Sequence, residues 1–102
     1  MTAAENDLRL LQALCQTSDR SLLRLACRAV RRHRWALVEH EVIFESCAEL
    51  ARLGARIERL PLAARLTRAG FPDVDLDALF SPLPAPDLVL RSHLDEGEGG
   101  WR

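Results

Sequence analysis

The sequence predicts an all-α protein, a compact bundle of five to six short helices. Leu and Ala are abundant, and both enter a helix at little cost in free energy. Apolar residues recur at helical spacing, whereas no run alternates with the period of two that is typical of a strand. The 102 residues suffice for one domain, which we expect at residues 4–94, followed by a flexible acidic and glycine-rich tail at residues 95–102.

Two helices are predicted in the first third of the chain. The first runs from about Ala3 to Gln16, because apolar residues recur there at helical spacing: Leu8, Leu11, Leu14 and Cys15. The second follows to about Arg32, with N-cap chemistry from the segment Thr17, Ser18 and Asp19. Residues 34–39 are expected to form an irregular connection.

Glycines mark the ends of the next two helices. The third is predicted from about Val38 to Leu53, with Gly54 as its C-cap, and its inward residues are Ile43, Phe44, Cys47, Leu50 and Ala51. Pro61 fits the first turn of a fourth helix, which ends at Gly70.

Proline and aspartate organise the last quarter. Asp73 or Asp75 is expected to cap a short helix that carries Leu76, Leu79 and Phe80. The proline-rich residues 81–86 end it, and Pro86 opens a last helix. The leucines of residues 83–94 have few obvious core partners, so they form a candidate association surface: Leu83, Leu88, Leu90 and Leu94. The alternative is that Leu88 and Leu94 fold back and complete the core.

Composition argues against secretion and membrane insertion. The first residues lack the apolar core of a signal peptide, and no stretch reaches the roughly 20 apolar residues of a membrane span. Cys15, Cys27 and Cys47 are an odd number with spacings that match neither a zinc site nor a disulfide framework. We therefore interpret them as reduced core residues of a cytoplasmic protein.

No motif for catalysis or for a cofactor is found in the sequence. It has no Gly-rich phosphate loop, no G-x-S-x-G and no H-E-x-x-H. Asp73, Asp75 and Asp77 lack the glycine and glutamate that a calcium loop requires. We expect no enzymatic activity, no cofactor, no metal ion and no small-molecule substrate.

The clearest polar pattern is what we call the arginine surface: Arg20, Arg24, Arg28, Arg31, Arg32 and Arg34, with Trp35 beside them. Steps of four, four and three residues place the first four along one helical face. The functional hypothesis is a surface for phosphates or for an acidic partner. The alternative is a solvated face, paired with a row of glutamates on the next helix: Glu41, Glu45 and Glu49.

Residues 34–70 carry a more specific pattern. An aromatic residue, a His and an Ile-Phe pair are followed by a Leu, a Gly, an Ile and a second helix that closes on Gly: Trp35, His40, Ile43, Phe44, Leu50, Gly54, Ile57, Leu66 and Gly70. In order and approximate spacing this resembles the N-terminal domain of bacterial replicative DNA helicases of the DnaB type. Glu58 stands where that family usually has Asp, and residues 71–75 depart from its pattern. The helical hairpin and the ATPase motor of the helicase have no counterpart in this sequence.

The resemblance implies an interaction module. In the helicase this domain belongs to the N-terminal collar and takes part in subunit association and primase contact. We therefore expect a protein partner, either a helicase, a primase or a second copy of this chain in a weak homodimer. The competing hypothesis is a small helix-turn-helix-like nucleic-acid binder that uses the basic face from Arg20 to Arg34. The net charge of −1 gives no general attraction to nucleic acid.

Overall fold

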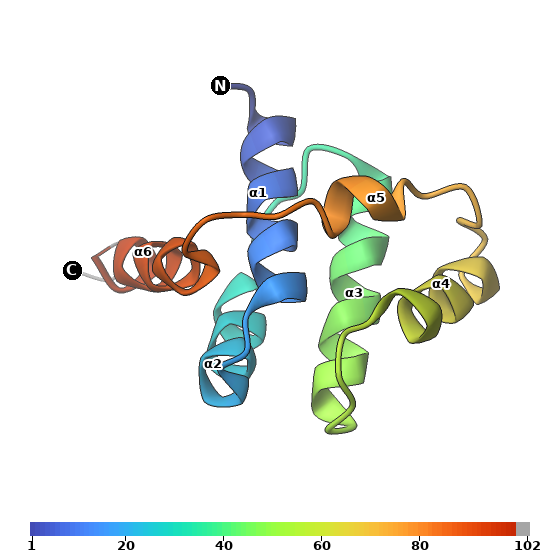
Figure 1. Ribbon diagram of the computed structural model, residues 1–102. Coiled ribbons are helices and arrows are strands. Elements are labelled where there is room, and N and C mark those ends of the chain that lie inside the picture. Colours follow the sequence, from blue (N-terminus) through green and yellow to red (C-terminus); the bar gives the residue numbers. More distant parts are fainter. Residues whose placement is uncertain (100–102) are drawn as a thin grey trace.

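Six α-helices form the regular structure of residues 1–99, which are the residues that this computed structural model describes, with side chains described for residues 1–95. The helices are α1 (Ala3–Gln16), α2 (Arg20–Val30), α3 (Val38–Arg52), α4 (Arg59–Arg68), α5 (Leu76–Leu79) and α6 (Pro86–Gly99) (Figure 1). No strand occurs within that range, so the predicted all-α class is confirmed. The radius of gyration of 12.8 Å is that of one compact domain of this length.

Side-chain caps begin three of the helices. The Thr2 hydroxyl accepts from the Glu5 N–H at the start of α1. The Asp19 carboxylate likewise accepts from a backbone N–H in the first turn of α2, and the Asp75 carboxylate accepts from one in α5. Each cap satisfies an amide that would otherwise lack a partner in the first turn. The predicted capping roles of Asp19 and Asp75 are confirmed.

Left-handed glycines end α3 and α4, as the sequence predicts. Gly54 has φ +74° and Gly70 has φ +89°. After each glycine the chain turns back, so that the Ala55 N–H donates to the Leu50 carbonyl and the Phe71 N–H donates to the Leu66 carbonyl. These are the hydrogen bonds of a Schellman motif.

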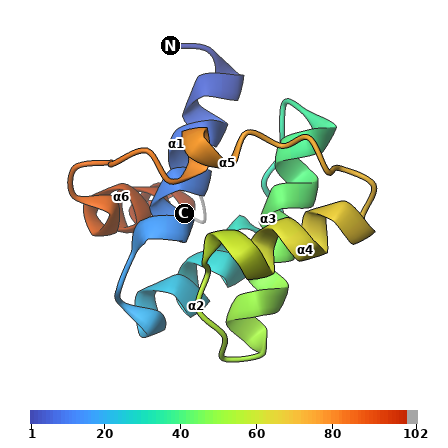
Figure 2. The same ribbon diagram turned by 45° about the vertical axis from the view of Figure 1, so that its right-hand side comes forward.

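Helix α1 is the central element of the core. Figures 1 and 2 show α6 on one side of it and α3, followed by α4, on the other. Its side chains Leu11 and Leu14 are fully buried. They belong to one core cluster that includes a buried residue from each of the five other helices: Val30, Cys47, Leu62, Leu79 and Leu90.

Gln16 ties the segment before α6 to the end of α1. Its side-chain amide donates to the carbonyls of Leu79 and Ser81 at 3.0 and 2.7 Å, and its side-chain oxygen accepts from the Leu83 N–H at 2.9 Å. One side chain therefore fixes the path of the proline-rich connection, which has no regular structure of its own.

The last helix continues beyond the predicted boundary between the domain and its C-terminal tail. Residue 95 lies inside α6, which continues to Gly99, and residues 100–102 of the predicted tail lie outside the described residues. Adding one residue to a helix that has already formed costs much less free energy than starting a helix. Polar residues can therefore extend a helix beyond the segment that packs against the core.

Candidate functional site

Helices α2 and α3 enclose a groove whose rim is arginine. Its volume is about 400 Å³, and its lining combines four cationic side chains with three small ones: Arg24, Arg28, Arg31, Arg52, Cys27, Ala48 and Ala51. We call it the α2–α3 groove. The two helices contact each other directly and lie side by side in Figure 2.

Helical periodicity explains the α2 wall of this groove. Leu22, Leu23, Ala26, Cys27 and Val30 are buried, so the opposite side of α2 faces solvent. Arg24, Arg28 and Arg31 recur at four and three residues beside that apolar side, and all three are exposed. The six arginines of the predicted arginine surface are therefore solvent-accessible, and the structure gathers three of them around one hollow.

Arg52 is the part of the groove that sequence reasoning missed. It lies in the last turn of α3 and reaches the groove only because α3 packs against α2. No sequence pattern signals this contribution, since it depends on how two helices pack rather than on spacing within one.

The alternative reading of the arginine surface, a solvated face paired with the glutamate row, holds for the exposure of the arginines but not for the pairing. Glu49 instead contacts Arg65 of α4 at 3.0 Å and Arg52 at 3.8 Å. Within residues 1–95, no ion pair involves an arginine of α2. The Arg52 contact is long and exposed, so it neutralises little charge. The groove therefore presents cations without carboxylates in its lining.

Trp35 is not part of this exposed surface, contrary to the sequence prediction. Its ring stacks on Phe44 of α3, with centroids 5.4 Å apart, and meets the edge of His33 at 4.6 Å. Trp35 is therefore half-buried against the core. A large aromatic ring gains more from burial than from lying beside a solvated cation.

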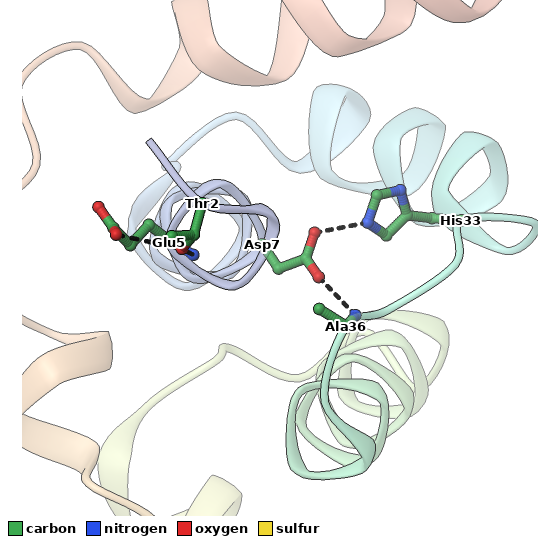
Figure 3. A network of polar contacts seen from close by, with 5 residues as sticks. All are labelled: Thr2, Glu5, Asp7, His33 and Ala36. Carbon is green, nitrogen blue, oxygen red and sulfur yellow. Dashed lines mark hydrogen bonds and ion pairs between the residues drawn. The ribbon is translucent and has the colours of Figure 1, made fainter.

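A buried carboxylate fixes the connection between α2 and α3. Asp7 of α1 is only 4% exposed, and both of its oxygens are bonded (Figure 3). One lies 2.7 Å from Nε2 of His33, and the other accepts from the Ala36 N–H at 2.8 Å. The sequence gives no signal for this role of Asp7, because its partners lie 26 and 29 residues away. This contact sets where α3 begins relative to α2, and so it positions the groove.

Three thiols from three helices form the buried layer beneath the groove. Cys15 and Cys47 have their sulfur atoms 3.7 Å apart, and Cys27 lines the groove itself. Burial, with a smaller effect of Cys15, raises the pKa of Cys27 from 9.0 to about 11. The hydrogen bond with Cys15, followed by burial, raises the pKa of Cys47 well above its usual range. Both thiols therefore stay protonated and poorly nucleophilic near neutral pH. All three cysteines are free and buried, as predicted.

The predicted association surface on α6 is wrong for most of its residues. Leu90 is fully buried, and Leu83 and Leu94 pack against the core; only Leu88 stays exposed, at 66%. The reason is that α6 contacts both α1 and α2, so its apolar side completes the core. The alternative reading, in which Leu88 and Leu94 complete the core, holds for Leu94 but not for Leu88.

Two of the three aspartates after Gly70 have structural partners. Asp75 caps α5, and Asp77 forms an ion pair with Arg59 at 2.6 Å. Among residues 1–95, no cluster of three or more His, Cys, Asp or Glu side chains has the arrangement to hold a metal ion.

Within the described part of the chain, none of the helices has the length and apolar character needed to cross a membrane. The chain matches no protein-family model, no curated protein and no solved structure.

Proposed function

We propose that this chain is a non-catalytic protein-binding module and that its partner docks on the arginine surface at the α2–α3 groove. One observation carries the proposal: four arginines surround a groove that has no carboxylate in its lining. The planar guanidinium group binds carboxylates through two parallel hydrogen bonds, so such a site favours an acidic protein surface.

The resemblance to the helicase collar domain supports the same role. The matching residues lie on α3 and α4 and in the loops beside them, and α3 supplies one wall of the groove, although none of the matching residues lines it. In that family the domain associates with other subunits and contacts primase. The replicative helicase, its primase and a second copy of this chain are therefore the partners to test first. Three free thiols support a cytoplasmic location, where cysteines remain reduced.

Isothermal titration of the full chain with purified helicase and primase tests this proposal. The variant Arg24→Glu/Arg28→Glu should weaken binding at least about ten-fold, because close charge pairs across an interface are each worth more than 1 kcal/mol. The control Arg9→Glu/Arg68→Glu changes the net charge equally on α1 and α4 and should leave affinity within about two-fold. Sedimentation of the chain alone tests self-association.

A different result would favour the nucleic-acid hypothesis. In that case duplex DNA would bind the chain with a steep salt dependence, and Arg24→Glu/Arg28→Glu would abolish this binding. The helicase, the primase and a second copy of the chain would not bind. That outcome would replace the proposal.

A further inference from the structure

We infer that the α2–α3 groove receives one acidic α-helix from the protein partner. The inference rests on the proposed function and specifies the ligand of the same site. It follows from the length of the groove, from the position of its charges and from the size of the residues on its floor.

The groove is longer than its main hollow. A small hollow of about 20 Å³ shares Arg24 and Ala51 with it. That hollow in turn shares Arg20 and Ala55 with a further one of about 330 Å³ at the beginning of α2. The three hollows therefore follow α2 along its 11 residues. At 1.5 Å per residue this is roughly 16 Å, which is about three turns of a helix.

Cations line both sides of this path. Three are on α2, one is its C-cap residue, and two come from the end of α3 and the loop after it: Arg20, Arg24, Arg28, Arg31, Arg52 and Arg56. Four residues of helix rise about 6 Å, so Arg20, Arg24 and Arg28 repeat at the same distance as glutamates placed every four residues on a partner helix. A partner helix lying along α2 can match these arginines one to one. Glu58, at the far end, is the single carboxylate among the residues that line the three hollows.

Small residues make up most of the floor in the first two hollows of the path. Cys27, Ala48, Ala51, Gly54 and Ala55 carry nothing larger than a thiol, and Leu23 is the one larger apolar residue there. A floor of this kind lets a second helix approach closely, toward the lower end of the usual 8–10 Å between packed helix axes. It therefore suits the apolar seam of an amphipathic helix.

A nucleic-acid backbone fits these features less well. Phosphates would engage the arginines but leave the thiol and methyl groups of the floor uncovered. Outside the groove the chain is acidic, since its net charge is −1 in spite of 14 basic residues. That charge repels an extended polyanion, whereas a single helix contacts only the groove.

Synthetic peptides test the inference with the full chain. The probe is a peptide of about 18 residues with glutamates every four positions along both sides of an Ala-Leu seam. A scrambled peptide of the same composition and a short DNA duplex are the comparison ligands. Fluorescence anisotropy should show the helical peptide binding at least about ten-fold more tightly than either of the two others.

Variants of the floor separate helix docking from simple charge attraction. Ala48→Leu should weaken binding of the helical peptide at least about ten-fold, because the added side chain fills the groove. Ala55→Leu is a second floor variant at an exposed position, should Ala48→Leu disturb folding. The control Ala64→Leu, exposed on α4 and outside the groove lining, should bind like the parent chain. Circular dichroism confirms that each variant is folded.

The possible results test the helix inference separately from the proposed function on which it rests. Equal binding of the helical and scrambled peptides, with no effect of the floor variants, would overturn the helix inference and leave an acidic-partner surface standing. Tighter binding of the duplex than of the helical peptide, or the absence of binding by both acidic peptides, would overturn the inference together with the proposed function.

Discussion

The chain contains neither Lys nor Tyr, which are the other side chains that ordinarily change charge between about pH 9 and about pH 11. Alkaline conditions therefore perturb the buried thiols selectively.

The direction of the effect follows from the raised pKa values. Cys27 has a pKa of about 11 in the folded chain against an ordinary 9.0, so it keeps its proton longer when folded. Between these two values the unfolded chain has lost more protons, and rising pH favours unfolding. The contribution to stability is complete below about pH 9 and is lost as the pH rises toward about 11.

The magnitude for Cys27 is about 2 kcal/mol. One pKa unit corresponds to about 1.4 kcal/mol, and the thiol at the groove is partly screened by solvent. Cys47 adds to the loss in the same direction, because hydrogen bonding and burial also raise its pKa. Such a loss is a large share of the 5–15 kcal/mol that stabilises a typical domain.

Urea unfolding followed by circular dichroism measures this effect between about pH 8 and about pH 11, with a phosphine reductant under argon. Thiolate absorbance in the ultraviolet should rise together with the unfolded fraction. Cys27→Ala should remove about 2 kcal/mol of the pH dependence, whereas the exposed-site control Ser21→Ala should keep it. A parent chain equally stable at both ends of the range would refute the reasoning, and so would an unchanged slope in Cys27→Ala.

Two further predictions concern packing. Asp7→Ala leaves the Ala36 amide and His33 without their buried partner, so the free energy of unfolding should fall by about 2–4 kcal/mol in urea titrations. The control Glu41→Gln, at an exposed position, should change it by less than about 0.5 kcal/mol, and equal losses in both would contradict a tie through Asp7. Leu90→Ala should cost about 2–5 kcal/mol because that side chain is fully buried, and Leu88→Ala should cost less than about 1 kcal/mol because it is 66% exposed. If calorimetry showed a large loss of stability in Leu88→Ala, the side of α6 that carries Leu88 would face the core, contrary to the structure.

The helices were predictable because their signals are local. The first helix has the predicted bounds, Ala3–Gln16, and Gly54 and Gly70 stop α3 and α4 as expected. The second helix ends at Val30, two residues before the predicted end. Caps and stops depend on a few neighbouring residues, so a single sequence contains them.

The composition of the site was predictable only in part. The arginines of α2 were found from their spacing, but Arg52 and the small floor residues enter through the packing of α3 on α2. Glu49 has helical spacing with Glu41 and Glu45, yet it contacts α4. Periodicity gives the face of a helix on which a residue lies, but not the helix that this face will meet.

Buried polar groups were the least predictable feature. Asp7 is an ordinary acidic residue near a helix start, and only the loop that follows α2 gives it two partners. Similarly, Cys15 and Cys47 are 32 residues apart in sequence and meet only in the core. Such contacts are long-range, so the local pattern contains no signal for them.

The position of α6 has a consequence for how the chain reaches its native state. Helical bundles usually fold fast because their contacts join neighbouring segments. Here the Thr17 hydroxyl donates to Asp87, 70 residues later, and the fully buried Leu90 of α6 joins the core around α1. The entropy of closing this long loop must be offset before α6 stabilises anything. During synthesis, the sides of α1 and α2 that α6 covers consequently remain exposed until α6 has been translated, and in that interval they can aggregate or bind chaperones.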